Sequence, residues 1–208
     1  LKSCMISIIT VTHNNFDDLN RTLNSLNEVE GIEKIVVNGG NCSKTKDYLT
    51  NFDGIAITEP DKGISDAFNK GVSNANGELV MFLNSGDVLL SRDYLSEAEK
   101  IINFNPEISF VHSDLVFEDR ISGDIRLTAL QPFFFKAPPL GRGMPYHHQS
   151  MIVLKKVFEK TGFFKLQYRI SMDFDWVCRL HKNGLGGFYW NKEPVVKMDG
   201  GGISALKE

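Results

Sequence analysis

The sequence has few cysteines, no excess of basic residues and no long apolar run. Its three cysteines, Cys4, Cys42 and Cys178, are too few and too scattered among 208 residues for a disulfide scaffold, which favours a reducing compartment. The net charge of −3 and the pI near 6.0 offer no basic surface for nucleic acid. No segment approaches the roughly 18–20 apolar residues of a membrane span, and the first residues lack a signal-peptide pattern. We therefore expect a cytoplasmic globular domain with no nucleic acid partner.

Two common phosphate-binding motifs are also missing. The glycines at residues 39–40 do not continue into G-x-G-x-x-G, and no G-x-x-x-x-G-K-[ST] occurs. A dinucleotide oxidoreductase and a P-loop NTPase are both disfavoured by these absences. The sequence also has no paired Cys and His spacing typical of structural zinc.

The first half of the chain alternates strand-like and helix-like segments. Apolar runs such as residues 79–83 show no polar alternation, which is typical of strands buried on both faces. Strands and helices that alternate in this way predict a parallel α/β sheet. We expect strands at residues 5–11, 35–37, 55–58 and 79–83, and helices at 15–27 and 64–75.

The second half is less regular. Residues 131–146 are rich in Phe, Pro and Gly and show no period. The Phe133-Phe134-Phe135 run there is open to two interpretations, core packing or a substrate- or membrane-facing loop. We expect a single domain over residues 1–208, with halves at 1–88 and 89–208. In the second half we expect strands at 108–117, 124–130 and 185–190 and helices at 157–162 and 171–182.

Polar clusters follow each predicted strand of the first half. Because ligands of open α/β sheets bind outside the carboxyl ends of the strands, these clusters predict one binding crevice. Each cluster taken alone is equally typical of loops and helix caps. The clusters are residues 12–15, 38–41, 59–63 and 84–87.

Asp87 and Asp173 are the carboxylates that these patterns single out. At the rim of the crevice, Asp87 could hold a divalent cation that also contacts a diphosphate, or it could cap a helix that starts near Ser91. Asp173 shares a helix face with Trp176 and Leu180, where desolvation would raise its pKa and suit a general base. The alternative for Asp173 is a first-turn carboxylate that stabilises the helix N-terminus.

Two adjacent histidines, His147 and His148, precede another strand-like run. They could bind a metal ion or a substrate, although a hydrogen-bonded structural histidine is the more common outcome. Trp176 and Trp190 are interpreted as core residues rather than as sugar-binding platforms.

Several of these segments together resemble glycosyltransferase family 2. The opening strand is similar to that of the family, the middle block resembles bacterial members that build capsule, exopolysaccharide or lipopolysaccharide, and later landmarks also match. The segments are SIITVTHN at residues 7–14, EPDKGI at 59–64, DAFNKG at 66–71, GELVMFLNSGD at 77–87, HQS at 148–150 and DFD at 173–175 with RL at 179–180.

The resemblance implies a GT-A fold, a Rossmann-like and mostly parallel sheet flanked by helices, followed by a mixed acceptor-side half. It implies that Asp173 deprotonates an acceptor hydroxyl for direct, inverting attack on the donor sugar. Asn38 stands where relatives usually have an Asp that binds the nucleobase. The implied nucleotide-sugar-binding residues are Val11, Thr12, His13, Asn38, Asp61, Gly63, Asn84, Ser85 and Gly86.

The D-x-D metal motif of the family is altered in this chain. Asn84 and Gly86 occupy its two carboxylate positions and leave Asp87 beside them as the metal ligand. A cofactor of Mg²⁺ or Mn²⁺ is therefore implied, with weaker binding or with help from His147 or His148. The physical need for a cation or for donors remains, because the leaving diphosphate gains negative charge.

The resemblance therefore implies an inverting glycosyltransferase of polysaccharide biosynthesis. The expected partners are a nucleotide-sugar donor, with a UDP-sugar as the first choice, and a saccharide or lipid-linked saccharide acceptor. A lipid-linked acceptor could bring the protein to the inner face of the cell membrane as a peripheral enzyme. One alternative is a catalytically silent sugar-nucleotide-binding subunit. Another is a sugar nucleotidyltransferase, which is disfavoured because the chain lacks the Gly-rich basic loop that such enzymes use.

Overall fold

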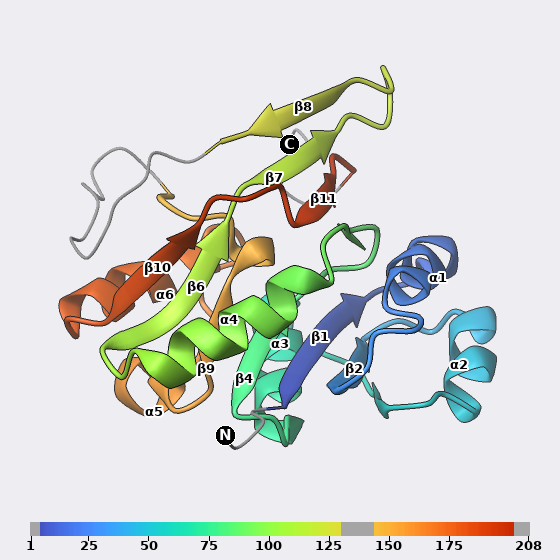
Figure 1. The fold of residues 1–208 in the computed structure, drawn as a ribbon. Coiled ribbons are helices and arrows are strands. Elements are labelled where there is room, and N and C mark those ends of the chain that lie inside the picture. The colour runs from blue at the N-terminus through green and yellow to red at the C-terminus, as the bar shows by residue number, and fades with distance from the viewer. Residues whose placement is uncertain (1–4, 130–143, 202–208) are drawn as a thin grey trace.

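The structure is a computed structural model that describes residues 5–129 and 144–201. It consists of a seven-stranded sheet flanked by helices and a smaller four-stranded sheet (Figure 1). The run Phe133-Phe134-Phe135 lies outside the described residues. No helix in the described part of the chain is long and apolar enough to cross a membrane.

The large sheet is parallel except for one strand. Its order is β10-β6-β9-β4-β1-β2-β3, and only β9 runs antiparallel to its two neighbours. The predicted α/β class with a mostly parallel sheet is thus confirmed. The strands are β1 (Ile6–Thr12), β2 (Ile32–Asn38), β3 (Ile55–Thr58), β4 (Leu79–Phe82), β6 (Ile108–Ser113), β9 (Ile152–Leu154) and β10 (Gly186–Trp190).

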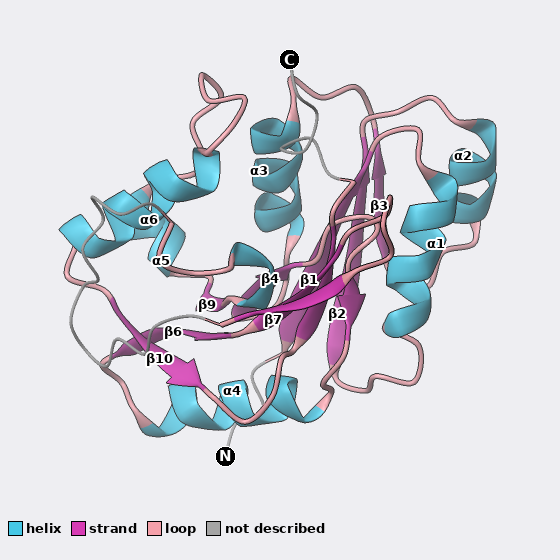
Figure 2. Ribbon diagram, turned by 90° about the horizontal axis from the view of Figure 1, so that it is seen from above, coloured by secondary structure: helices cyan, strands magenta, loops and turns pink. Residues whose placement is uncertain are grey.

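Helices cover both faces of this sheet, as Figure 2 shows. In β1, Ile8 and Ile9 are fully buried and belong to different cores, since successive side chains of a strand point to opposite faces. Ile9 packs in the core that contains Phe68 and Trp176, whereas Ile8 packs in the core that contains Tyr94. The helices are α1 (Phe16–Ser25), α2 (Ser43–Thr50), α3 (Ile64–Asn74), α4 (Asp93–Phe104), α5 (Val157–Thr161) and α6 (Met172–Lys182), with a short 3-10 turn η2 (His148–Ser150).

The strand predicted at residues 108–117 is two strands, because the chain divides there between two sheets. β6 is buried along its whole length and ends at Ser113, whereas the next strand is buried only at its first residue. The small sheet has the order β5-β11-β7-β8 and mixes parallel and antiparallel pairs. Its strands are β5 (Val88–Leu89), β7 (Leu115–Glu118), β8 (Ile125–Thr128) and β11 (Val196–Asp199).

The small sheet lies beside the carboxyl edge of the large one, because β7 continues directly from the end of β6 (Figure 1). One of its strands, β5, follows β4 closely in sequence, and another, β11, comes from the end of the described chain. Segments from both predicted halves therefore meet at the edge where the polar clusters lie. The division at residue 88 itself stays a prediction.

Candidate active site

The loops after β1, β2 and β3 lie together at the carboxyl edge of the sheet. The parallel register pairs Thr12 with Asn38, and Asn38 with Thr58, so these strands end side by side. Asn14, at a φ of 54°, accepts hydrogen bonds at Oδ1 from the backbone N–H groups of Asn41 (2.7 Å) and Cys42 (3.0 Å). The first two loops are thereby joined directly.

The third loop approaches the second just as closely. A Cβ atom at Gly39 would lie 1.7 Å from Oδ2 of Asp61, so any side chain at residue 39 would displace the Asp61 carboxylate. Asp61 Oδ1 accepts a hydrogen bond from the backbone N–H of Gly63 at 2.8 Å, and Gly63 has a φ of 110° that favours glycine. Asp61 and Gly63 thus form the tight turn that begins α3.

The residues predicted to bind the nucleobase differ in exposure. His13 is exposed and Val11 is half-buried, whereas Thr12 and Asn38 are buried. Asn38 Oδ1 accepts a hydrogen bond from Gly40 N–H at 3.0 Å. Within the described residues, Asn38 Nδ2 and Thr12 Oγ1 are buried without a hydrogen-bond partner. At the paired ends of β1 and β2, one amide donor and one hydroxyl group are therefore available to a ligand.

The loop at residues 84–87 is supported from behind by α1. Thr22, which is fully buried, accepts a hydrogen bond from Gly86 N–H at 2.9 Å and lies 3.1 Å from the carbonyl oxygen of Asn84. Gly86 N–H also lies 3.2 Å from the carbonyl oxygen of Asp18. A Cβ atom at Gly86 would lie 2.9 Å from Oδ2 of Asp199, so β11 closes the other side of this loop.

Asp87 is buried. The sequence-based prediction that it lies at the rim of the crevice was wrong. It is 3% exposed, and its Oδ1 accepts a hydrogen bond from the backbone N–H of Asp199 at 2.9 Å. The alternative of a helix cap is also wrong, because β5 follows Asp87 and α4 begins only at Asp93. Burial raises the pKa of Asp87 to about 6, against the opposing effects of the Asp199 N–H and of His148.

This loop also concentrates oxygen atoms that have no hydrogen-bond partner. In the part of the chain that the structure describes, Asn84 Oδ1, Ser85 Oγ and Asp87 Oδ2 are all buried without one. Buried polar atoms are rarely left unpaired in folded proteins, so such atoms indicate a position for a ligand, an ion or water. Oxygen atoms of this kind suit a hard divalent cation or the hydroxyl groups of a sugar.

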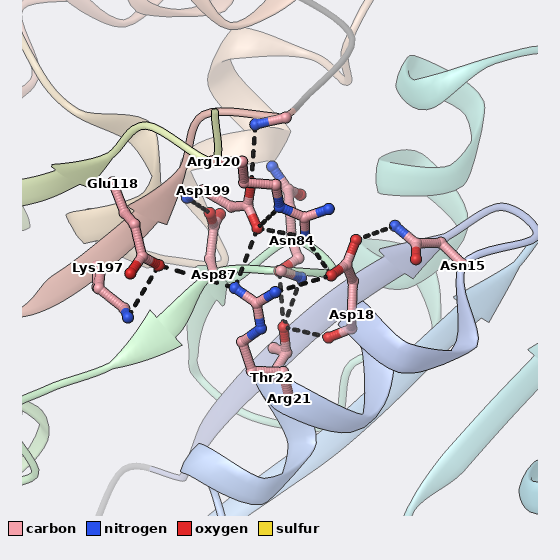
Figure 3. A network of polar contacts seen from close by, with 12 residues as sticks. Asn15, Asp18, Arg21, Thr22, Asn84, Asp87, Glu118, Arg120, Lys197 and Asp199 are labelled. Atoms are coloured by element: carbon pink, nitrogen blue, oxygen red, sulfur yellow. Dashed lines mark hydrogen bonds and ion pairs between the residues drawn. The ribbon is translucent and has the colours of Figure 1, made fainter. Parts of the chain in front are cut away.

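A cluster of charged side chains surrounds the back of the loop (Figure 3). Two buried carboxylates, Asp18 and Asp199, both pair with Arg21 and Arg120. Arg120 Nε donates to Asp199 at 2.6 Å, and a terminal nitrogen of Arg120 pairs with Asp18. Arg21 lies 3.2 Å from each of the two carboxylates. The cluster joins α1 to β11 and to the turn after β7. It was not predicted from the sequence, although Asp18 and Thr22 share a buried helix face with Leu19 and Leu23, which was the available signal.

Asp173 contacts His148 at the start of α6. Oδ2 of Asp173 lies 3.1 Å from Nδ1 of His148, and Nε2 of the same ring lies 3.4 Å from Nδ2 of Asn84. Asp173, Trp176 and Val177 line one apolar hollow, which agrees with the predicted shared helix face. Burial tends to raise the pKa of Asp173, but the contact with His148 and the N–H of Phe174 outweigh it and lower the pKa overall. The predicted rise in this pKa was therefore wrong.

The two adjacent histidines point to different parts of the molecule. His147 Nε2 lies 3.1 Å from the carbonyl oxygen of Thr128 at the end of β8, whereas His148 lies against Asp173. Among the described residues, no three His, Cys, Asp or Glu side chains form a group that could hold a metal ion. The arrangement gives no support to a metal role for either histidine. Trp176 and Trp190 are both buried, as predicted.

Residues 7–163 match the family model described as glycosyl transferase family 2. The chain belongs to glycosyltransferase family 2. The protein named "Uncharacterized glycosyltransferase Rv1514c" from Mycobacterium tuberculosis (strain ATCC 25618 / H37Rv) is 30% identical over 184 residues, which cover 84% of this chain and 68% of that protein. "PGL/p-HBAD biosynthesis glycosyltransferase Rv2957" from the same strain is 27% identical over 160 residues, 73% of this chain and 59% of that protein.

Solved structures show the same fold as this family 2 glycosyltransferase. S. aureus TarS 1–349 in complex with UDP-GlcNAc matches with a TM-score of 0.74 at 14% identity, over 94% of this chain and 58% of that one. The mannosyltransferase PcManGT from Pyrobaculum calidifontis, in complex with GDP-Man and Mn²⁺, matches with a TM-score of 0.69 at 15% identity, over 95% of this chain and 57% of that one. The predicted GT-A fold is confirmed. The chain spans less than two thirds of both structures.

Family membership also decides between the predicted classes. The chain is a glycosyltransferase by family, and the nucleotidyltransferase alternative has no support. The predicted subgroup of capsule, exopolysaccharide or lipopolysaccharide enzymes stays a prediction, because the relatives above are mycobacterial proteins with other names.

Proposed function

We propose that the protein transfers a sugar from a nucleoside diphosphate sugar to a hydroxyl group of a saccharide or a lipid-linked saccharide, with inversion at the anomeric carbon. The observation that carries this proposal is the continuous contact from Asn84, in the loop after β4, through His148 to Asp173 on α6. Donor-side polar groups and a carboxylate suited to the acceptor thereby meet in one place.

For the donor, we assign the nucleoside to the edge formed by β1, β2 and β3. Thr12 Oγ1 and Asn38 Nδ2, unpaired within the described residues, can bind the polar edge of a base, with Val11 and His13 beside them. Asp61 and Gly63 then lie at the ribose and diphosphate. A UDP-sugar is our first choice, because TarS is seen with UDP-GlcNAc, although PcManGT is seen with GDP-Man.

The loop at residues 84–87 fits a divalent cation that is shared with the donor. Asp87 is the one acidic residue in this loop, and its Oδ2 is buried without a partner among the described residues. We assign Asp87 to Mg²⁺ or Mn²⁺, with the diphosphate as the other source of oxygen ligands, and Asn84, Ser85 and Gly86 to the sugar. Such a cation would offset the charge that develops on the leaving diphosphate.

Asp173 is the carboxylate that we assign to deprotonation of the acceptor. Its lowered pKa keeps it ionised at neutral pH, so its negative charge is available to favour removal of the hydroxyl proton. Asp175, two residues later, instead pairs with Lys165 and Arg179 at 3.1 and 2.9 Å and is already neutralised.

A lipid-linked acceptor would place the protein at the cytoplasmic face of a membrane as a peripheral enzyme. The segment that leads into α6 carries three exposed apolar side chains, Phe163, Leu166 and Ile170, close in sequence to Asp173. Exposed apolar side chains of this kind can contact a membrane surface. The compartment itself stays a prediction.

A catalytically silent sugar-nucleotide-binding subunit is the second candidate, favoured by Asn84 and Gly86 at the positions of the D-x-D carboxylates. A thermal-shift panel of UDP-, GDP- and dTDP-sugars, with and without Mn²⁺, tests donor binding for both candidates. Slow hydrolysis of the donor that binds best then separates them. We expect the wild-type protein to hydrolyse it and Asp173→Asn to lose that activity; binding without any hydrolysis would favour the silent subunit.

A further inference from the structure

The loop that joins α5 to α6, residues 162–171, is attached to one face of α3. Asn69 holds Phe164 by two hydrogen bonds, from Nδ2 to the Phe164 carbonyl oxygen (2.8 Å) and from the Phe164 N–H to Oδ1 (2.9 Å). Ser65 Oγ donates a hydrogen bond to the carbonyl oxygen of Tyr168 at 3.2 Å. Residues four apart lie on the same face of a helix, so Ser65 and Asn69 attach both arms of the loop to that face.

Between these two arms the chain reverses direction in a turn. The N–H of Tyr168 donates to the carbonyl oxygen of Lys165 at 3.2 Å, which closes a β-turn with Leu166 and Gln167 at its centre. Phe164, on the first arm, is buried in the core that also contains residues of α3 and α6. The loop therefore has an inner side that packs on the protein and a tip that is turned away from α3.

Three large apolar side chains of this loop are exposed to solvent. Phe163 is 45% exposed, Leu166 at the tip is 46% exposed and Ile170 is 55% exposed. Phe163 directly precedes the buried Phe164, so the attachment to α3 leaves it outside the core. Contact of such side chains with water is unfavourable, and transfer into an apolar medium removes that cost. The loop is therefore a candidate interaction surface.

Basic side chains lie among and beside these apolar ones. Residues 156–170 contain four basic residues and one acidic residue, whereas the whole chain has a net charge of −3. A lipid bilayer with anionic headgroups matches this combination, because apolar side chains enter the interface while cations stay at the headgroups. The basic residues are Lys156, Lys160, Lys165 and Arg169, all exposed, and the acidic one is Glu159. One of them, Lys165, also pairs with Asp175 at 3.1 Å.

The loop leads directly to the proposed base. Ile170 precedes Asp173 by three residues, so their Cα atoms are at most about 11 Å apart. On the other side, Ser65 is the second residue of α3 and follows closely on Gly63, which we assign to the diphosphate. A bilayer in contact with this loop would therefore lie close to the residues proposed to act on the acceptor.

We propose that the loop at residues 162–171 docks on an anionic lipid surface, with its exposed apolar side chains in the interface and the neighbouring basic side chains at the headgroups. The inference deepens the proposed function and rests on it, because a lipid-linked acceptor is held in such a bilayer. The apolar side chains supply the attachment, and the basic side chains select anionic over neutral headgroups. The protein would thereby meet its acceptor at the membrane surface without a membrane-spanning segment in the described residues.

Sedimentation of the protein with lipid vesicles tests this docking without any activity. We expect binding to vesicles of phosphatidylcholine with phosphatidylglycerol, much weaker binding to phosphatidylcholine alone, and weaker binding at high salt because the charges are screened. Leu166→Ser combined with Ile170→Ser should lower binding to the anionic vesicles by about tenfold or more. Lys160→Gln combined with Arg169→Gln should lower it by on the order of tenfold and leave binding to neutral vesicles unchanged.

Two matched double variants serve as controls and should bind vesicles like the wild-type protein. Ile125→Ser with Leu127→Ser removes exposed apolar side chains from β8, and Lys44→Gln with Lys46→Gln removes exposed charges from α2. If the loop variants bind like the wild-type protein, or the controls lose as much binding, the loop is not the docking surface. Equal binding to neutral and anionic vesicles would overturn the choice of an anionic lipid.

A second copy of the chain is the other occupant that the experiment distinguishes. Sedimentation velocity that shows a dimer lost in Leu166→Ser with Ile170→Ser, together with no vesicle binding, would assign the surface to that copy and overturn the proposal. We expect a mass that does not depend on these two residues.

Hydrolysis of a soluble sugar nucleotide in the absence of vesicles separates this inference from the proposed function. The loop variants should hydrolyse it at the wild-type rate, because the substituted side chains are not assigned to the donor or to the base. If the wild-type protein hydrolyses a sugar nucleotide but binds no vesicles, the docking surface is wrong while glycosyl transfer stands. If it binds vesicles through the loop but binds no sugar nucleotide, the proposed function fails while the lipid surface stands.

Discussion

Two carboxylates of the proposed site have pKa values shifted in opposite directions, and the cause lies in single contacts. Asp87 is desolvated and has one oxygen without a partner in the described part of the chain, so its pKa rises to about 6. Asp173 is also partly buried, but His148 and a backbone N–H favour its ionised form and lower its pKa. A bound cation would therefore stabilise the ionised form of Asp87, whereas Asp173 stays ionised without a cation.

Replacing Asp173 by Asn should strongly slow transfer while leaving the donor bound. The amide removes the negative charge beside His148 but keeps the size of the side chain, so we expect a loss of about 10²–10⁴-fold in kcat. Donor affinity by calorimetry should change less than about twofold. Asp175→Asn, on the same helix but paired with Lys165 and Arg179, is the control and should retain turnover. Turnover near the wild-type level in Asp173→Asn would remove this residue from the mechanism.

Replacing Asp87 by Asn should weaken cation binding and increase the stability of the folded protein. The raised pKa means that the ionised carboxylate destabilises the fold at neutral pH, so a neutral isostere should increase the free energy of unfolding at pH 7 by on the order of 1–3 kcal/mol. The same change should remove the dependence of donor affinity on Mn²⁺. Urea unfolding and calorimetry with and without Mn²⁺ measure the two effects. Equal metal dependence in both proteins would argue against Asp87 as a ligand.

At the scale of elements, helix α1 determines the shape of the loop at residues 84–87. Thr22 accepts a hydrogen bond from the loop at Gly86 and lies within hydrogen-bond distance of the Asn84 carbonyl, and the charged cluster around Asp18 and Asp199 links the same helix to the small sheet. The loop is therefore held between two elements that are far apart in sequence. The backbone contacts hold in place the three side-chain oxygen atoms of this loop that have no partner among the described residues.

Thr22→Val should loosen this loop without changing any residue assigned to the ligand. Valine keeps the shape of threonine but removes the hydroxyl, so Gly86 N–H loses its 2.9 Å contact, and we expect a loss of about 1–2 kcal/mol in unfolding free energy and weaker donor binding. Thr22→Ser keeps the hydroxyl and is the matched control for donor affinity. If both variants bind the donor equally well by calorimetry, the hydroxyl does not position the loop.

At the scale of the whole molecule, a buried histidine of β6 links stability to pH. His112 is 1% exposed, lies among the rings of Phe110, Tyr146 and Tyr189, and has an Nδ1 without a hydrogen-bond partner in the described residues. Burial, helped by nearby His147, lowers its pKa to about 3. The neutral ring is therefore part of the packing where β6 leaves the large sheet.

The folded protein should lose stability as the pH falls below about 6.5, because between that value and about 3 the unfolded chain binds a proton at residue 112 that the folded protein does not. Asp87 has the opposite effect between about 4 and 6, since its raised pKa means that the folded state binds the proton. Comparison with His112→Phe isolates the histidine. From pH 7 to pH 5 the wild-type protein should lose about 2 kcal/mol more than the variant by urea unfolding. Parallel profiles would contradict the prediction.

The sequence by itself determined the sheet, most of its strands and the residues at its carboxyl edge. Apolar runs such as residues 79–83 predict buried strands because a strand covered on both faces needs no polar alternation. The positions of Asn38 and Asp61 followed from the same prediction, since loops after parallel strands must meet at one edge. Local periodicity and chain order were sufficient for these features.

Only the tertiary structure decided how the carboxylates are ionised and which residues hold them. The pKa shift of Asp173 depends on His148, 25 residues earlier in the chain, and the burial of Asp87 depends on Asp199 and α1. Desolvation and hydrogen bonding act over a few ångströms in space, whatever the separation in sequence. The same is true of Arg120, whose partners come from α1 and β11. The sequence therefore indicated where a ligand would bind, and the packing decided which groups could do the chemistry.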